Sequence, residues 1–405
     1  MTNPDKDLLF LSQRIPYPPN KGDKIRSYNI LRHLAASRRV HLGCFVDDPD
    51  DWQHVEVLKD ICDETCFVRL NPGREKFRAL KGLFTGEALS LPFYRNREMA
   101  NWVESLVARR TPANAFVFSS AMAQYILPRR PSFRQFLMDF VDVDSDKWRQ
   151  YADSQSWPKS LIYKREFEKL LTYDRKVASS ADASILVSEA EAELFRNLAP
   201  ESAERIFAIE NGIDCDFFTP GMEFQTPYSG QSPILVFTGA MDYWPNVDAV
   251  TWFAKDVFPG IRARWKDAAF FIVGGGPTAD VRKLQGQPGI FVTGRVVDVR
   301  PYVAHAHAVV VPLRIARGIQ NKILEGMAMA KPVIASPQAL EGIECKAGEE
   351  MFVAETAAEI IAAVAQVVEE PDAERMGGAA RRRMVEFYDW DTKLARLDAL
   401  LDSEK

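Results

Sequence analysis

Three polar residues lie within one turn of a predicted helix that starts after Gly318 and ends before Pro332. Asn321, Lys322 and Glu325 are three and four positions apart, so their side chains project near one face. A carboxylate there can accept hydrogen bonds from both hydroxyls of a ribose, and a lysine can bind a diphosphate. The alternative is a surface Lys–Glu pair, which contributes roughly a few tenths of a kcal/mol.

Two arginines add positive charge at the same helix start. Arg314 and Arg317 come shortly before Lys322 in the sequence. The start of a helix already carries a partial positive charge, so basic residues are unfavourable there unless an anion binds. The pattern therefore predicts an anion site, and a diphosphate fits its charge.

A second candidate for phosphate binding is the loop that joins a predicted strand to a predicted helix within residues 14–34. Gly22 lets backbone come close to a ligand, and the N–H groups at the helix start suit a phosphate. Lys24 and Arg26 add positive charge. In the alternative interpretation this is a solvated loop, with Asp23 as the residue that caps the helix.

A glycine-rich turn follows another predicted strand, at Gly274, Gly275, Gly276 and Pro277. It indicates a sharp turn or a close approach of the backbone to another group, and it does not match the G-x-G-x-x-G dinucleotide pattern. The turn at residues 244–246 is either a site loop or a helix start.

Aspartates cluster at and just beyond the carboxyl end of a further predicted strand: Asp139, Asp142, Asp144 and Asp146. Asp139 interrupts an apolar run, which is costly if its carboxylate is buried without a partner. We expect one of these residues to bind a substrate hydroxyl and others to be turn or helix-cap residues. No further ligand set for a divalent metal accompanies them.

Composition is that of an ordinary globular protein. The chain has 405 residues, 47% of them hydrophobic, which is enough for two domains. A formal net charge of −5 argues against a general nucleic-acid binder. The sequence predicts neither a signal peptide nor a membrane span, and we expect a cytoplasmic protein.

Metal ligands with a typical spacing are missing. Cys62 and Cys66 form a C-x3-C pair without a second pair, which favours free thiols over a zinc site. His305 and His307 are more simply core or surface residues than metal ligands.

Short apolar runs alternate with amphipathic stretches along the whole chain, and this alternation is typical of doubly wound parallel sheets. The first series of predicted strands covers residues 7–13, 40–46, 65–70, 115–120, 136–143, 183–188 and 205–212. The second series covers residues 233–240, 268–276, 289–294, 307–313, 331–336 and 349–355. Between the two series, residues 215–233 are polar and rich in Gly and Pro, so we expect a linker there. Ligands of such sheets bind at the carboxyl ends of the strands.

Two amphipathic segments have open roles. Residues 381–401 form a predicted helix that packs either on its own domain or on the first one. Residues 73–86 form a predicted helix with basic and apolar residues, which either contacts anionic lipid or packs within its domain.

Several segments together resemble a GT-B retaining glycosyltransferase of family four, also known as glycosyltransferase group 1. The most specific is "KILEGMAMAKPVIAS" (322–336), and "YDRKVASSADASILVSEAEAELF" (173–195), "IENGIDCDFFTP" (209–220) and "FFIVGGGP" (270–277) follow the family order. "FVDVDSDKW" (140–148) and "TGAMDYWPNVDAVTWF" (238–253) look like the sugar transferases of bacterial exopolysaccharide clusters.

The resemblance implies an α/β protein with two Rossmann-like, doubly wound domains facing an interdomain cleft. We expect an acceptor-side domain at residues 1–212, a donor-binding domain at residues 213–385, and a C-terminal helix at residues 386–405. It makes Glu325 the ribose partner of a nucleotide-sugar donor. It implies no metal and no cofactor, since the nucleotide sugar is a substrate.

The chain departs from the family pattern where the diphosphate cations are expected. The family has two Glu residues around the helix start, and Arg317 occupies the first of these positions. Ala240 replaces the usual Arg after a strand-end Gly, and the Lys that usually follows is missing. Arg314, Arg317 and Lys322 are the candidate replacements. Asp139 and Asp142 are the polar residues nearest to a missing family His.

The expected catalytic residues are therefore Asp139, Asp142, Arg317 and Lys322. The expected donor-binding residues are Gly22, Asp23, Lys24, Arg26, Gly239, Asn246, Gly274, Gly275, Gly276, Pro277, Arg295, Arg314, Gly318, Asn321, Lys322 and Glu325.

The predicted function is transfer of a sugar, with retention, from a nucleoside-diphosphate sugar to a hydroxyl of a glycan or lipid-linked glycan in exopolysaccharide biosynthesis. The alternatives are a sugar-nucleotide epimerase on the same fold and a non-catalytic protein that binds nucleotide sugars. A contact with the inner face of the membrane is a further hypothesis, and nucleic acid is not an expected partner. The sequence does not identify the sugar, the nucleotide base, the acceptor or the oligomeric state.

Overall fold

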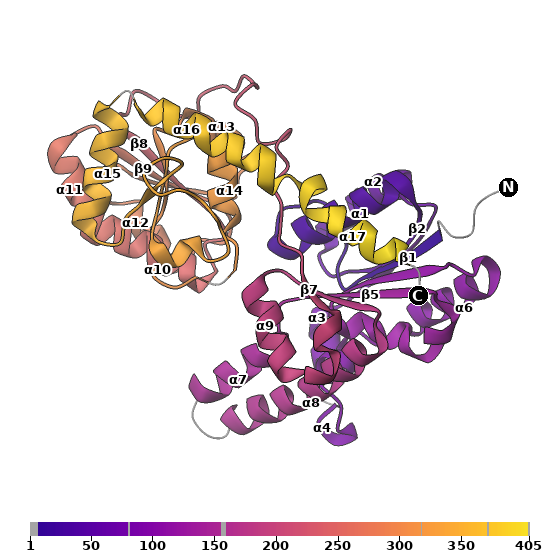
Figure 1. Cartoon of the computed structure of the whole chain (residues 1–405). Helices are drawn as coiled ribbons and strands as arrows, with labels where there is room; N and C mark the ends of the chain where they lie inside the picture. Colours follow the sequence, from indigo (N-terminus) through magenta and orange to yellow (C-terminus); the bar gives the residue numbers. More distant parts are fainter. Residues whose placement is uncertain (1–6, 80–81, 155–158, 317, 371, 404–405) are drawn as a thin grey trace. The chain divides into compact units, whose positions relative to one another are not determined.

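The computed structural model describes residues 7–79, 82–154, 159–316, 318–370 and 372–403. The chain divides into two compact units, Met1–Glu210 with Leu394–Lys405 and Asn211–Lys393. Each unit has one parallel β-sheet with helices around it (Figure 1).

The first unit has a seven-stranded sheet in the order β3-β2-β1-β4-β5-β6-β7. Its strands are β1 (Asp7–Ser12), β2 (Arg39–Val46), β3 (Glu64–Arg69), β4 (Asn114–Phe118), β5 (Gln135–Val141), β6 (Ala183–Leu186) and β7 (Ile206–Ala208). Each predicted run of the first series overlaps one of these strands, and β2, β3, β4 and β5 begin one residue before the predicted run. All residues of β1 and β4 are buried, as expected for strands with helices on both faces.

The helices of this unit connect successive parallel strands. The α-helices are α1 (Gly22–Ser37), α2 (Val55–Ile61), α3 (Pro72–Ala79), α4 (Gly82–Thr85), α5 (Ser90–Phe93), α6 (Arg97–Arg110), α7 (Asp144–Ser154), α8 (Lys159–Ser180) and α9 (Glu189–Leu198). Shorter 3-10 turns are η2 (Pro49–His54), η3 (Ser120–Tyr125), η4 (Leu127–Ser132) and η5 (Pro200–Arg205). The predicted amphipathic helix at residues 73–86 is represented by α3 and α4, and residues 80–81 lie outside the described residues.

The second unit has a six-stranded sheet in the order β10-β9-β8-β11-β12-β13. Its strands are β8 (Ile234–Thr238), β9 (Ala269–Val273), β10 (Ile290–Gly294), β11 (Ala308–Val311), β12 (Val333–Ala335) and β13 (Phe352–Val353). All six predicted runs of the second series contain a strand. The strand order reverses between β8 and β11, and such a switch point is where doubly wound sheets bind ligands.

Helices also cover this second sheet. They are α10 (Trp244–Trp252), α11 (Phe258–Arg264), α12 (Ala279–Leu284), α13 (Arg300–His305), α14 (Asn321–Ala328), α15 (Ala357–Glu369) and α16 (Asp372–Arg383). The short segments are the π-helical η6 (Phe253–Val257) and η8 (Met384–Tyr388) and the 3-10 turn η7 (Pro337–Leu340). The predicted linker, residues 215–233, contains neither a helix nor a strand.

The single C-terminal helix predicted at residues 381–401 is wrong in one respect, because the chain leaves helical geometry at Asp389 (φ −61°, ψ 143°). The Tyr388 carbonyl accepts a hydrogen bond from the Ile213 N–H instead of continuing a helix. A new helix, α17 (Trp390–Asp402), follows. It packs on the first unit beside α1 (Figure 1), where Asp398 pairs with His33 at 2.8 Å.

Candidate functional site

The carboxyl ends of β8 and β9 meet through their backbones. Gly239 follows β8 with φ +150°, and Gly274 follows β9 with φ +155°. A Cβ atom on Gly274 would lie 1.7 Å from the Gly239 carbonyl oxygen, so no side chain fits there. The predicted glycine-rich turn is therefore present, and its glycines allow the backbone after β9 to contact the backbone after β8 in the same unit.

The rest of the glycine-rich turn lies over the loop that follows β8. The Met241 N–H donates to the Gly275 carbonyl at 2.8 Å. Gly276 has φ +70°, and a Cβ atom there would lie 3.1 Å from the Asp242 carboxyl carbon. Arg295, which follows β10, approaches the Gly275 position with its Nε at 3.5 Å. Three predicted donor-binding segments thus share the carboxyl edge of this sheet.

Lys322 points at the same edge from the first turn of α14. Its Nζ donates to the side-chain oxygen of Asn246 at 3.1 Å and to that of Gln320 at 3.4 Å. Asn246 is buried, and its amide nitrogen donates to the Ala240 carbonyl at 2.9 Å, which fixes the direction of its oxygen. The ammonium also lies 5.1 Å from the centre of the Phe237 ring.

Among the residues that the structure describes, no carboxylate lies within ion-pair distance of Lys322. Burial lowers the pKa of Lys322 to about 8, and the Glu325 carboxylate opposes this shift. A partly buried cation held by neutral amide oxygens is unfavourable in itself and gains from a bound anion.

Glu325 lies one turn further along α14. Burial raises the pKa of its carboxyl group, while Lys322 and the hydroxyl of Thr238 act in the opposite direction. Thr238 is the last residue of β8 and is buried, so the carboxyl group is close to the switch point of the sheet. The structure therefore brings together Gly239, Asn246, Gly274, Gly275, Gly276, Arg295, Lys322 and Glu325.

Other predicted residues around α14 differ in their surroundings. The guanidinium of Arg314 makes two bonds to Asp248, at 2.5 and 3.0 Å, so it is not available to a diphosphate unless this pair opens. Gly318 has φ +62° and supplies the predicted break before the helix. The side-chain oxygen of Asn321 is buried and has no hydrogen-bond partner among the described residues, which do not include Arg317.

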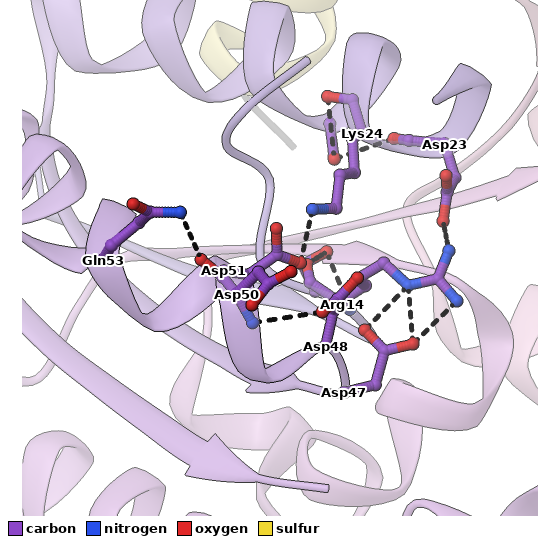
Figure 2. A network of polar contacts seen from close by, with 10 residues as sticks. Arg14, Asp23, Lys24, Asp47, Asp48, Asp50, Asp51 and Gln53 are labelled. Atoms are coloured by element: carbon purple, nitrogen blue, oxygen red, sulfur yellow. Dashed lines mark hydrogen bonds and ion pairs between the residues drawn. The ribbon is translucent and has the colours of Figure 1, made fainter. Parts of the chain in front are cut away.

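The predicted phosphate loop of the first unit is internally neutralised (Figure 2). Arg14, which the sequence did not single out, lies between Asp23 at 2.6 Å and Asp47 at 3.0 Å. The buried ammonium of Lys24 pairs with Asp51 at 2.6 Å. The expectation that Lys24 offers its charge to a phosphate is therefore corrected, since a carboxylate 27 positions away already binds it.

Arg26 also faces inward instead of toward a ligand. It is fully buried and donates to Asp139 at 2.8 Å and to the Ile209 carbonyl at 2.8 Å. Asp139 is fully buried as well, which raises the pKa of its carboxyl group, and Arg26 opposes that shift. Neither side chain is exposed to a substrate in this structure, contrary to the predicted binding and catalytic roles.

The start of α1 retains two features of the prediction. No atom lies within 4 Å of a Cβ atom built on Gly22, so this position is open. Lys21 occupies the N-cap position and makes no side-chain cap bond, so Asp23 is not the cap residue. Asp23 instead binds Arg14, and within the described part of the chain the N-cap side chain does not bind the N–H groups of the first turn.

Asp142 lies just beyond β5, as predicted, and is partly exposed. Its carboxylate binds Lys147 at 2.8 Å, and Lys147 also binds Asp144 at 2.8 Å. These carboxylates raise the pKa of Lys147 against the effect of burial, so this lysine stays charged. Of the two predicted catalytic aspartates, Asp142 is the partly exposed one, because Asp139 is fully buried.

Two titratable groups at the same edge were missed in the sequence. Burial raises the pKa of Asp174, in α8, to about 8, and its carboxyl group faces the hydroxyls of Ser120 and Ser145. The turns next to these serines contain Ser119 and Val141, both with positive φ. No sequence signal reveals Asp174, whereas Lys147 follows the aspartate cluster directly and could have been included.

None of the described helices has the length and apolar sequence that a bilayer crossing requires.

Known proteins are similar to both units of this chain, the second in sequence and both in fold. Residues 232–370 match the family model of the glycosyl transferases group 1. A comparison with curated protein sequences gave no match. Among solved structures, Anabaena HepE in complex with UDP is 14% identical, with a TM-score of 0.67 over 98% of this chain and 100% of that chain.

Two further structures have the same extent of similarity. Sucrose-phosphate synthase from Thermosynechococcus elongatus is 17% identical, with a TM-score of 0.67 over 98% of both chains. WaaG, a glycosyltransferase involved in lipopolysaccharide biosynthesis, is 14% identical, with a TM-score of 0.64 over 98% of this chain and 100% of that chain. The chain therefore has the GT-B fold, and its residues 232–370 match the glycosyl transferases group 1.

Proposed function

We propose that this chain is a glycosyltransferase that transfers a sugar from a nucleoside-diphosphate sugar to a hydroxyl of a glycan or lipid-linked glycan. The match of residues 232–370 to glycosyl transferases supports the activity. The similar HepE structures contain UDP or UDP-glucose, which supports a nucleotide-sugar donor.

The observation that carries the proposal is the environment of Lys322. Its ammonium lies at the switch point of the second sheet and is bound by neutral oxygens of Asn246 and Gln320. The donor diphosphate supplies the missing negative charge. The start of α14 adds a second, weaker attraction for the same anion.

Glu325 and the glycine contact complete the donor site. The Glu325 carboxylate accepts hydrogen bonds from the ribose hydroxyls, and the positive charge of Lys322 opposes the rise in its pKa that burial causes. Gly239 and Gly274 allow the two backbone segments to approach each other beside Asn246, because a Cβ atom on either residue would clash there.

The chemical step breaks the bond between the anomeric carbon and the diphosphate oxygen and forms a bond from that carbon to the acceptor oxygen. Lys322 stabilises the charge that develops on the leaving diphosphate. In the retaining, front-face path, a phosphate oxygen takes the acceptor proton, so no strong protein base is needed. Asp142 orients the acceptor hydroxyl, and the reaction needs neither a metal nor a cofactor.

The biological setting is part of the proposal. The segments around Asp142 and Asn246 resemble sugar transferases of exopolysaccharide clusters, so we assign the product to a bacterial exopolysaccharide made in the cytoplasm. Phe77 in α3 is 78% exposed beside basic residues, which supports a peripheral contact with the inner face of the membrane.

A thermal-shift screen with UDP-, GDP- and dTDP-sugars identifies the donor, since a ligand that binds only the folded state raises the melting temperature. We expect one donor class to bind the wild type and to lose at least about 10-fold in affinity with Glu325→Gln. Glu369→Gln, at an exposed position of the same unit, is the matched control. The donor is then incubated with and without oligosaccharide acceptors.

The three candidate functions give different products in that incubation. Sugar transfer that requires an acceptor supports the proposal. An isomerised sugar nucleotide formed without acceptor supports an epimerase, and tight binding without turnover supports a non-catalytic binding protein. Absence of binding by any donor contradicts all three.

A further inference from the structure

The amino-terminal edge of the first sheet, where β2 and β3 begin, gathers one imidazole and two carboxylates. His41 lies opposite Glu64 in the pairing of β2 with β3, and Asp63 directly precedes β3. One potential ligand atom from each of these three residues lies within 4.8 Å of the other two. This cluster is at the opposite end of the strands from the sites described above and has no role in the proposed glycosyl transfer.

The orientation of the His41 ring is set by Asp7. The ring is fully buried, and its Nε2 lies 3.4 Å from one carboxylate oxygen of Asp7. The other oxygen of Asp7 accepts a hydrogen bond from the Arg39 guanidinium at 2.6 Å, which fixes the position of the Asp7 side chain. The tautomer of His41 with its hydrogen on Nε2 donates to Asp7 and leaves the Nδ1 lone pair free to bind a ligand.

Nδ1 of His41 faces a second carboxylate. It lies 3.7 Å from an oxygen of Asp63 and has no hydrogen-bond partner among the described residues. A lone pair on Nδ1 and a carboxylate oxygen repel each other unless a proton or a metal ion lies between them. The 3.7 Å separation is too long for a hydrogen bond, but it suits a metal ion with bonds of about 2.0–2.2 Å to each atom.

We propose that His41, Asp63 and Glu64 bind a divalent transition metal of the zinc type. Imidazole together with carboxylate is a ligand set for Zn²⁺ and related ions, whereas Mg²⁺ and Ca²⁺ prefer oxygen ligands alone. Asp7 holds the imidazole in the tautomer that a metal requires, as carboxylates behind metal-binding histidines do. The ion ties the start of β2 to the start of β3.

Two arginines compete for the same carboxylates. Arg109 and Arg110 bind Glu64 at 3.0 and 2.9 Å, and Arg110 lies 3.6 Å from Asp63. Their side chains are 51% and 39% exposed, so each can turn into solvent at little cost. Asp63 is itself 35% exposed and gives an ion access to the buried Nδ1.

The test uses the full chain without a histidine tag, stripped with EDTA and then incubated with Zn²⁺ or Co²⁺. We expect about one Zn²⁺ per chain after gel filtration, visible absorption from bound Co²⁺, and a melting temperature raised by about 5 °C at a 100-fold excess of ion over its Kd. Asp63→Asn should weaken Co²⁺ binding at least 10-fold. Asp60→Asn, an exposed neighbour in α2, is the control and should bind like the wild type.

His41→Gln should abolish binding, but it changes a fully buried residue, so its interpretation requires that the variant unfolds cooperatively. Asp63→Asn changes a partly exposed residue and keeps the test valid if His41→Gln does not fold. The proposal is overturned if the stripped wild type takes up neither ion, or if Asp63→Asn binds as tightly as Asp60→Asn.

Discussion

Each unit has basic residues near the start of a helix that follows a strand: α1 after β1 in the first unit, and α14 after β11 in the second. The surroundings of these residues differ between the two units. In the first unit, Lys24 and Arg26 are bound by carboxylates within hydrogen-bond distance. In the second unit, Lys322 is bound only by amide oxygens of the described residues. We infer from this difference that a basic helix start is a candidate anion site only where the protein does not neutralise the charge itself.

The largest expected effect is a loss of stability when the buried Arg26–Asp139 ion pair of the first unit is broken. Arg26→Ala leaves Asp139 buried without its partner, so we expect the first unit to lose about 3–5 kcal/mol of stability. Donor binding by the second unit should stay unchanged. Urea unfolding and donor calorimetry at a temperature where the variant is folded measure the two quantities.

A double variant, Arg26→Met with Asp139→Leu, serves as the control for this result. Replacing both members of a buried ion pair with apolar residues is often close to neutral. A single variant as stable as the wild type would show that the pair does not hold the first unit together.

Gly274→Ala tests the backbone contact between Gly274 and Gly239 in the second unit. The added Cβ atom would meet the Gly239 carbonyl, so the loops must separate at a cost of about 1–3 kcal/mol, with a loss of donor affinity of at least 10-fold. Gly22→Ala adds a Cβ atom in open space and is the matched control, with stability expected within about 0.5 kcal/mol of the wild type. Thermal unfolding and donor titration follow both variants; equal behaviour of the two would contradict the close contact.

The pKa of Lys322 predicts a pH dependence of donor binding. With a pKa of about 8, the ammonium is mostly charged at pH 7 and mostly neutral at pH 9, so affinity for a nucleoside diphosphate should fall about 10-fold over this range. The sign follows because an anion binds the charged form. Lys322→Arg remains charged and should show a nearly flat profile. A wild-type profile as flat as that of the variant would exclude Lys322 from the site.

The same pKa has a consequence for stability in the absence of donor. A lysine with a lower pKa in the folded state than in the unfolded state binds protons more weakly when folded. Its unfavourable contribution is present below pH 8 and disappears as the pH rises from about 8 to about 10.5, so it makes the free energy of unfolding increase with pH in this window. The contribution is absent in Lys322→Ala.

The smallest expected effect belongs to Arg314, which the sequence placed at the diphosphate. Because Asp248 already binds its half-exposed guanidinium, Arg314→Ala should change donor affinity less than about two-fold and stability by less than about 1 kcal/mol. Donor calorimetry measures the effect. A loss above 10-fold would mean that the Arg314–Asp248 pair opens on binding and that the original prediction holds.

Local sequence patterns predicted the strands and helices well, but they did not predict which charged side chains pair with one another. The buried strands are readable because apolar runs such as residues 233–240 are short and bounded by polar or glycine-containing turns. The break at Gly318 and the shared face of Lys322 and Glu325 follow from spacing along one helix.

Long-range neutralisation could not be predicted in the same way. Asp139 lies 113 positions from Arg26, and Asp51 lies 27 positions from Lys24. No local spacing rule connects such pairs. The sequence therefore does not distinguish a basic residue that is paired with a carboxylate from one that is not. The sequence predicts that Asp139 is costly if it is buried without a partner, but it does not identify Arg26 as that partner.

One comparison of affinities tests the central claim most directly. Lys322→Ala and Lys24→Ala are titrated at pH 7 with whichever of UDP, GDP and dTDP binds the wild type most tightly. We predict at least a 10-fold loss for Lys322→Ala and a change below about two-fold for Lys24→Ala, whose ammonium is occupied by Asp51. Equal losses in the two variants, or a loss only in Lys24→Ala, would contradict the account.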